Sequence, residues 1–282
     1  MEGHRFDPGP GHHRGSRSGS AFFVVRGQDG PMEVHRKQRR SAPHGFFAVE
    51  AAGLTWLAAA NAVRVARVVA VGGDFIEVER LKTTAPAPAD ADAFGTALGA
   101  LHDASADAFG APPAGWSGDG YIGNAPLPLR TEPTWGTFYA RWRLEPYLAA
   151  SGIDRAGVST LERLCSALEA GTFDDPAPPA RLHGDLWNGN VLWTPTGVAL
   201  IDPAAHGGHR ITDLAMLNLF GAPHLERILA AYAAATAHLP DGWRELIGLH
   251  QVHPLLVHAV LFGGHYRAEA VAAAQQALAL AH

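Results

Sequence analysis

The chain of 282 residues contains very little cysteine: Cys165 is the only one. A single cysteine excludes an intramolecular disulfide, so a reducing compartment is compatible with the sequence. Cys165 lies in the apolar-periodic stretch Leu161–Leu168. A lone cysteine in such a stretch behaves as a small core residue and not as a nucleophile.

The chain also has no excess of positive charge. It carries 22 Lys and Arg against 27 Asp and Glu, which gives a formal net charge of −5. Such a chain has no overall basic field to hold nucleic acid or an anionic membrane. The short basic run Arg36–Arg40 is typical of a solvated face, so we expect no nucleic-acid partner.

Long hydrophobic runs are absent as well. A membrane helix needs about 20 predominantly apolar residues, and the alanine-rich run Ala51–Val71 is interrupted by Arg64 and Arg67. Met1–Ser20 is rich in Gly, His, Arg and Pro and has no apolar core of a secretory signal. We therefore expect a cytoplasmic protein without a membrane partner, in which residues 1–18 form a flexible N-terminus.

The pattern of the remaining residues indicates an α+β fold with two lobes. Residues 19–82 predict a small, β-rich N-terminal lobe with one main helix. Its expected strands are Ala21–Arg26, Met32–Lys37, Val65–Val71 and Phe75–Val78, its helix is Phe46–Ala60, and its turns are Gln28–Gly30 and Gly72–Asp74.

Residues 83–282 predict a larger and mainly helical C-terminal lobe. It opens with the linker Thr83–Asp90 and contains two short strands, Val191–Trp193 and Val198–Ile201. Pro254 is expected to kink or split the sixth helix. The predicted helices span 91–102, 135–150, 157–170, 210–220, 225–238, 242–262 and 267–281. Two lobes leave a cleft between them, which is a common place for a ligand site.

The segment His183–Asn190 has the spacing of a kinase catalytic loop: His, one residue, Asp, four residues, Asn. Phosphoryl transfer to a hydroxyl needs a carboxylate that orients the hydroxyl and accepts its proton, and it needs oxygen ligands for Mg²⁺. Asp185 fits the role of base, and Asn190 fits that of a metal ligand. Asp202, at the end of the second short strand, fits the main Mg²⁺ ligand. Asp213 opens a helix, and we interpret it first as structural, either capping that helix or bonding the loop from behind.

A phosphate clamp is predicted in the small lobe. Lys37 ends a strand and Glu50 lies early in the following helix, the context of a kinase Lys–Glu pair. The glycine turn that should cover the phosphates has one candidate, Gly15–Ser20, in which Gly19 and Ser20 are the expected contacts. No P-loop motif is present.

Each of these residues also has a plain structural alternative. Asp202 could cap a strand, Glu50 could be a solvated helix residue, and Lys37 could be a surface lysine. His206 and His209 could be taken for zinc ligands, but no further ligand sits at a suitable spacing, so we interpret both as loop histidines. The ordered combination of loop, clamp and second carboxylate favours a protein-kinase-like fold.

At these residues the sequence resembles the fructosamine/ketosamine kinases, which are relatives of the aminoglycoside phosphotransferases. Both families share the sequence His-Gly-Asp at 183–185 and the later Asn190. The pair Leu186-Trp187, which lies between Asp185 and Asn190, resembles the ketosamine branch specifically. The resemblance covers roughly residues 20–270. Its motifs are Leu182–Val191, Ile201–Ala204, Gly208–Arg210, Asp213–Met216, Leu219–Gly221, Phe46–Leu54, Gly120–Gly123, Trp135–Tyr139, Leu255–Ala259 and Leu261–Tyr266.

The resemblance implies ATP- and Mg²⁺-dependent phosphorylation of a sugar hydroxyl on a small-molecule or protein-linked ketosamine, as a deglycation repair. By position it makes Lys37 and Glu50 the ATP clamp, and it places Glu79 and Leu81 beside adenine. Trp187 faces the acceptor in this interpretation, although a packing role is equally open. We include His183 and Arg210 as further candidate substrate contacts.

Two alternatives remain open at this stage. An aminoglycoside- or choline-type phosphotransferase would act on a cationic acceptor, which favours clustered acidic residues. Segment 221–282 has only four carboxylate side chains, which argues modestly against such an acceptor: Glu226, Asp241, Glu245 and Glu269. A catalytically silent nucleotide-binding protein on the same fold would not require all five site residues. Nothing in the sequence sets the oligomeric state.

Overall fold

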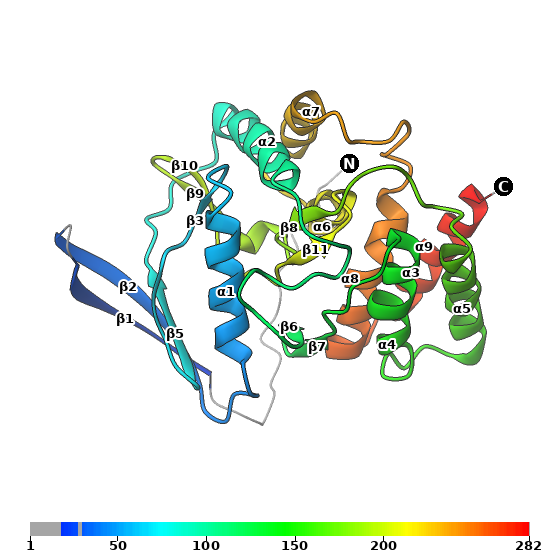
Figure 1. The fold of residues 1–282 in the computed structure, drawn as a ribbon, viewed down its shortest axis with the longest axis horizontal. Helices are drawn as coiled ribbons and strands as arrows, with labels where there is room; N and C mark the ends of the chain where they lie inside the picture. Colours follow the sequence, from blue (N-terminus) through cyan, green and yellow to red (C-terminus); the bar gives the residue numbers. More distant parts are fainter. Residues whose placement is uncertain (1–17, 28–29, 282) are drawn as a thin grey trace.

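We describe the protein from a computed structural model that covers residues 18–27 and 30–281. The smaller lobe contains an antiparallel sheet in the order β1-β2-β5-β4. Helix α1 (Phe46–Ala58) lies between this sheet and the helices of the larger lobe (Figure 1). The strands are β1 (Ser18–Gly27), β2 (Gly30–Arg39), β4 (Val68–Val71) and β5 (Phe75–Glu79).

The predicted strands and helix of this lobe are confirmed, with two corrections. The expected strand Val65–Val71 is broken: β3 (Arg64–Val65) instead pairs in parallel with a strand of the larger lobe. Gly19 and Ser20 belong to β1, opposite Gln38 and Lys37, and not to a turn. The rest of the predicted glycine turn, residues 15–17, lies outside the described residues, and so do residues 28 and 29 of the predicted turn between β1 and β2.

The larger lobe is mainly helical, as predicted. Three short two- or three-stranded sheets lie among its helices. Its helices are α2 (Pro88–Asp103), α3 (Trp135–Tyr139), the π-helix Ala140–Leu144, α4 (Glu145–Leu148), α5 (Arg155–Glu169), the 3₁₀ turn Asn188–Asn190, α6 (Ile211–Phe220), α7 (Leu225–Ala235), α8 (Ile247–Phe262) and α9 (Tyr266–Leu280). Its strands are β6 (Gly120–Ile122), β7 (Ala125–Leu127), β8 (Ala180–Leu182), β9 (Val191–Thr194), β10 (Gly197–Leu200) and β11 (His206–Gly208).

Three features of this lobe differ from expectation. The predicted helix 135–150 is divided by a π-helical turn at Ala140–Leu144. The sixth predicted helix, 242–262, begins later than predicted, at Ile247. Pro254 does not split it, and α8 continues through this residue to Phe262. Strands β6, β7, β8 and β11 were not predicted, since three residues are too few to show a periodicity.

One hydrophobic core joins the two lobes. Leu54 and Leu57 of α1 and Ile76 of β5 are almost fully buried in the same cluster as Leu101 of α2 and Leu200 of β10. Burying a side chain of this size contributes about 1.5–3 kcal/mol to folding, so the contact fixes the two walls of the cleft against each other. A second cluster packs α3, α5, α8 and α9 together. No described helix is long and apolar enough to cross a membrane.

Five buried histidines make the fold sensitive to acid. His102, His183, His206, His250 and His253 are at most 3% exposed. Burial lowers the pKa of each of them, and that of His206 falls to about 3. All five are therefore neutral in the folded protein at any pH near neutrality.

This burial predicts a loss of stability between about pH 6.5 and pH 5. Below the ordinary histidine pKa of about 6.5, the unfolded chain binds protons that the folded chain cannot accept, so stability is complete above this pH and is lost as the pH falls. Each histidine adds a slope of up to about 1.4 kcal/mol per pH unit. Urea unfolding at pH 7.5 and 5.5 should show a free energy of unfolding lower by about 2 kcal/mol or more at pH 5.5. Equal values at the two pH values would contradict the assignment.

Candidate active site

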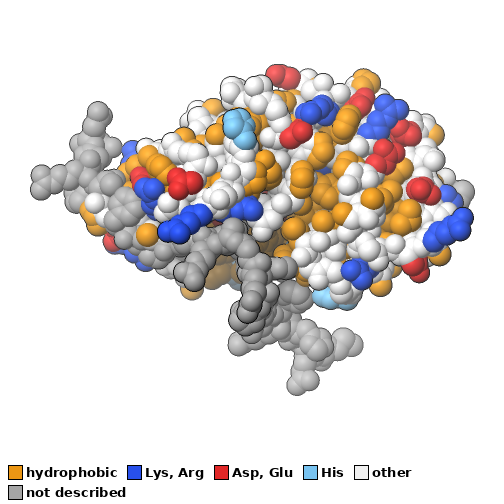
Figure 2. Space-filling view, turned by 90° about the horizontal axis from the view of Figure 1, so that it is seen from below, with side chains coloured by type: hydrophobic (Ala, Val, Ile, Leu, Met, Phe, Trp, Pro, Cys, Tyr) orange, Lys and Arg blue, Asp and Glu red, His pale blue; other side chains and the backbone are white. Residues whose placement is uncertain are grey.

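A cavity of about 390 Å³ lies between the two lobes. Figure 2 shows the molecule hollowed between its smaller and larger parts. The smaller lobe contributes Lys37 and Glu50 to the cavity, and the larger lobe contributes Asp185, Asn190 and Asp202. Residues predicted from distant parts of the sequence are therefore brought to one place.

Lys37 connects both sides of the cavity. It lies on β2, which is a central strand of the sheet, and its ammonium donates hydrogen bonds to Glu50 of α1 and to Asp202 Oδ1, the latter at 2.8 Å. Burial lowers the pKa of Lys37, but the attraction of Glu50 and Asp202 outweighs it, so the net shift is upward. A permanent positive charge is thus held at the mouth of the cleft, where it could neutralise an anion.

Asp202 occupies an unusual backbone conformation. It follows β10 with a φ of 54°, in the left-handed region that few residues other than glycine adopt. Strained residues of this kind collect at functional sites, where the surrounding structure fixes them. The side chain of Asp202 is 43% exposed, so one oxygen bonds Lys37 while the carboxylate remains open to the cavity.

Asn190 and Asp185 are held as a pair. The Asn190 side-chain nitrogen donates to the Asp185 carbonyl at 2.8 Å, to Asp185 Oδ2 at 3.1 Å and to the Asp202 carbonyl at 3.4 Å. Burial raises the pKa of Asp185 to about 7, although the hydrogen bond from Asn190 lowers it in part. A carboxylate with this pKa is well matched to accepting a proton near neutral pH.

The loop that carries Asp185 is anchored from behind by Asp213 of α6. The fully buried Asp213 accepts hydrogen bonds from the His183 backbone nitrogen at 2.8 Å and from the Gly184 backbone nitrogen at 2.9 Å. Burial raises the pKa of Asp213, but its contacts with His102 and Gly184 outweigh this and lower it overall. Of the two structural roles considered for Asp213, the contact with the loop is therefore the one observed.

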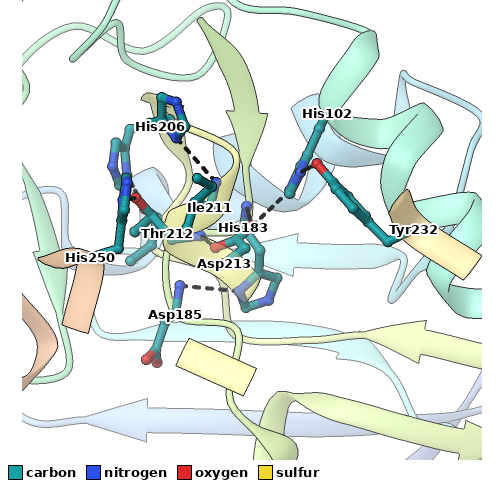
Figure 3. Close-up of polar contacts among 12 residues, drawn as sticks. His102, His183, Asp185, His206, Ile211, Thr212, Asp213, Tyr232 and His250 are labelled. Carbon is teal, nitrogen blue, oxygen red and sulfur yellow. Dashed lines mark hydrogen bonds and ion pairs between the residues drawn. The ribbon is translucent and has the colours of Figure 1, made fainter. Parts of the chain in front are cut away.

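A chain of buried groups supports Asp213 in turn. His102 Nε2 lies 3.2 Å from Asp213 Oδ2, and His102 Nδ1 lies 2.8 Å from the Tyr232 hydroxyl. Because the ionised Asp213 can only accept, Nε2 of His102 carries the hydrogen and Nδ1 accepts from Tyr232. Figure 3 shows this group lying behind the loop, whereas the Asp185 carboxylate points away from it.

Gly184 is required by the close approach of the next strand segment. Its φ of 81° is left-handed, and a Cβ atom at this position would lie 2.2 Å from the Ala204 carbonyl oxygen. No residue larger than glycine fits there without moving the backbone. The glycine of His-Gly-Asp therefore sets the separation between Asp185 and the Asp202 segment.

Two predicted substrate contacts do not reach the cavity. His183 is fully buried and its Nε2 lies 2.8 Å from the Ile201 carbonyl, which ties the loop to the end of β10. Arg210 is also fully buried and donates to Asp103 at 2.6 Å and to Thr236 at 3.0 Å. Neither side chain can touch a substrate without rearrangement, so we assign both to the support of the site.

Other predicted contacts also lie away from this cavity. The carboxylate of Glu79 accepts from the Arg67 backbone nitrogen at 3.2 Å, and Leu81 packs half-buried against the core. Neither of these two residues lines the cavity. Contacts of Glu79, Leu81, Gly19 and Ser20 with a nucleotide remain predictions.

The two histidines considered for zinc have other partners. His206 Nδ1 lies 2.8 Å from the Ala204 carbonyl, and His209 Nε2 lies 3.0 Å from Asp175 Oδ2. Both are buried. His209 lies in the loop before α6, as predicted, whereas His206 belongs to β11 and not to a loop. Within residues 18–27 and 30–281 no three His, Cys, Asp or Glu side chains form a metal-binding group.

Further residues line the cavity, and two of them had no predicted role. Trp187 lines the cavity and is 39% exposed, and its contact with an acceptor remains a prediction. The β6–β7 hairpin adds Tyr121, whose hydroxyl donates to the His44 carbonyl at 3.2 Å, and Asn124, whose Oδ1 accepts from Arg39 at 2.9 Å. Tyr121 belongs to a motif singled out in the sequence, but nothing there indicated that it meets the cleft.

Comparisons with known proteins agree on one family. A model of the family described as fructosamine kinase matches residues 17–280. A probable ketoamine kinase of Thermus thermophilus is 35% identical over 233 residues, which are 82% of this chain and 82% of that protein. The crystal structure of a candidate fructosamine-3-kinase of Thermobifida fusca has a TM-score of 0.82 and 41% identity and covers 94% of each chain.

More distant structures share the fold alone. A macrolide 2'-phosphotransferase of Brachybacterium faecium has a TM-score of 0.56 at 19% identity and covers 92% of this chain and 91% of its own. The predicted bilobal, protein-kinase-like fold is thereby confirmed.

The anchoring role of Asp213 predicts the effect of replacing it. In Asp213→Asn, the amide has one acceptor oxygen where the carboxylate has two, so a buried N–H of the loop or of His102 loses its partner. We expect the free energy of unfolding in urea to fall by about 2–4 kcal/mol. Asp154→Asn is the control, because the exposed Asp154 also accepts a backbone N–H, from Gly157 at 2.8 Å. Equal losses in the two variants would contradict the special role of Asp213.

Proposed function

The chain belongs to the fructosamine kinase family, and on this premise we propose that it transfers a phosphoryl group from ATP to a sugar hydroxyl of a ketosamine. A ketosamine is a sugar linked to an amine through a ketose carbon. Its phosphorylated form is unstable, so the amine is released and the reaction serves deglycation. The names of the relatives support this substrate class.

The observation that carries the proposal is the convergence of five side chains at one cavity. Lys37, Glu50, Asp185, Asn190 and Asp202 line the same space and are joined by direct hydrogen bonds. A binding scaffold without catalysis does not require a base that is positioned opposite a cation. The arrangement therefore favours a working phosphotransferase over a silent nucleotide-binding protein.

The chain's own residues divide the work between donor and acceptor. Lys37, oriented by Glu50, holds the negative phosphates at the small lobe. Asp185 accepts the proton of the sugar hydroxyl as the oxygen attacks the phosphorus, and its raised pKa suits this step. Asp213 acts at a distance, by fixing the loop backbone so that Asp185 faces the cavity.

The donor set fits a hard divalent cation such as Mg²⁺. Asn190 uses its side-chain nitrogen for three hydrogen bonds, and no described group donates to its oxygen, which stays available as a ligand. Asp202 is 43% exposed and is bonded to Lys37 through one oxygen. Amide and carboxylate oxygens are the ligands that Mg²⁺ prefers. When bound at Asn190 and Asp202, Mg²⁺ would offset the charge of the phosphates.

A choline- or aminoglycoside-type acceptor is less well supported. Structures of choline and aminoglycoside kinases are at most 15% identical to this chain, so they support the fold and no substrate.

The substrate class can be tested with a panel of acceptors. We expect the enzyme, ATP and Mg²⁺ to transfer radiolabelled phosphate to a ribose- or fructose-derived ketosamine. Kanamycin, choline and free sugars, assayed at the same concentration, should be labelled at a rate lower by at least about tenfold, since a lost hydrogen bond or contact costs this much. Faster labelling of kanamycin or choline would overturn the substrate assignment.

Replacing Asp185 and replacing Asp202 should affect different properties of the enzyme, namely turnover and Mg²⁺-dependent ATP binding. In Asp185→Asn, turnover should fall by at least about 10²-fold while ATP binding persists, because the base is lost and the clamp is not. In Asp202→Ala, calorimetry should show the loss of Mg²⁺-dependent ATP binding. Glu226→Gln is the control, since Glu226 is 75% exposed, pairs with Arg244 and does not line the cavity. Full turnover in Asp185→Asn would contradict its role as base.

A further inference from the structure

We propose that an aromatic strip beside the cavity binds the amine-borne part of the substrate and favours ketosamines whose amine carries an aromatic group. The strip consists of Trp187, Phe220, His258, Phe262 and Tyr266. The proposal rests on the proposed function, because it names which ketosamines the same site prefers.

The members of the strip form a continuous series of ring contacts. The centroid of Trp187 lies 6.5 Å from that of Phe220, and Phe220 lies 4.8 Å from His258. His258 then lies 5.4 Å from Phe262 and 4.9 Å from Tyr266. Distances of about 4.5–7 Å between centroids are typical of favourable aromatic pairs. The strip thus extends from the catalytic loop across the end of α6 to α8 and the start of α9.

The two ends of the strip are open to solvent. Phe262 is 65% exposed and Trp187 is 39% exposed, which places both among the few large hydrophobic side chains that the described residues leave exposed. An apolar surface of this kind commonly marks a binding site.

The strip is continuous with the wall of the cavity at two points. Trp187 itself lines the cavity. On the other side, a Cβ atom on Gly123 would lie 3.5 Å from Leu261, the residue before Phe262, and Gly123 also lines the cavity. The strip therefore borders the cavity through Trp187, which lies close in the sequence to the predicted base.

The chemistry of the substrate identifies the occupant of the strip. The sugar hydroxyl must reach Asp185, and the amine is covalently attached to that sugar, so the amine substituent must lie against the nearby wall. Trp187 is two residues from Asp185 in the sequence. The strip itself has no Lys, Arg, Asp or Glu, and burial lowers the pKa of His258, so that ring is neutral near pH 7. A row of neutral rings offers stacked and edge-to-face contacts to an aromatic group, which gains more from them than a small polar group does.

A matched pair of substrates tests the proposal. The ketosamines of 2-phenylethylamine and of ethylamine differ only in the phenyl group. For the unmodified enzyme we expect the KM of the phenylethyl compound to be about three- to tenfold lower than that of the ethylamine compound, with similar kcat. A difference of this size corresponds to the energy of about one aromatic contact.

Variants at Phe262 locate the effect. Phe262→Ser should remove most of the preference for the phenyl group, by raising the KM of the phenylethyl compound more than that of the ethylamine compound, whereas Phe262→Trp should retain the preference. Leu280→Ser is the matched control: Leu280 is 44% exposed at the far end of α9 and should have no effect on either substrate. Because Phe262 is so exposed, its replacement should not disturb folding.

Two results would overturn the proposal in distinguishable ways. If the natural chain phosphorylates both compounds with equal KM, or if Phe262→Ser changes both KM values equally, the strip is not the amine site and the proposed function stands. If neither compound is phosphorylated, the proposed function falls, and the assignment of the strip falls with it.

Discussion

The ammonium of Lys37 is shared by two carboxylates that come from opposite sides of the cleft, and the geometry of the site depends on this sharing. Glu50 reaches it from α1, and Asp202 reaches it at 2.8 Å from the end of β10. The three side chains thus connect a strand and a helix of the smaller lobe to the larger lobe. A cation held between two anions is stable without ligand, and it is ready to bind phosphates that compete for the same charge.

The remainder of the site is built in layers behind this contact. Asn190 joins Asp185 to the Asp202 backbone, and Asp213 fixes the loop from the rear through the His183 and Gly184 nitrogens. Behind the loop, Asp213 is fully buried and its oxygens accept hydrogen bonds from within the protein. At the cavity, the side chains of Asp202 and Asn190 keep oxygens free to accept from or bind a ligand.

The chemistry of the site could be predicted from the sequence because it depends on spacing along the chain. The His183–Asn190 motif and Asp202 are joined by one hairpin, and Lys37 and Glu50 by one strand-to-helix connection. The burial of His183 and Arg210, the pairing of β3 with β10 and the place of Tyr121 at the cavity depend on contacts between distant segments. A single sequence has no periodicity that records such contacts, which is why these features were missed.

The central claim is that one cavity aligns a sugar hydroxyl with Asp185 and phosphates with Lys37. The most direct test is a crystal structure of the protein with a non-hydrolysable ATP analogue, Mg²⁺ and a ketosamine. We expect oxygens of Asp202 and Asn190 at about 2.0–2.1 Å from the metal, and a sugar hydroxyl within about 3 Å of the Asp185 carboxylate. A ketosamine bound outside this cavity, or a metal held by neither residue, would contradict the account.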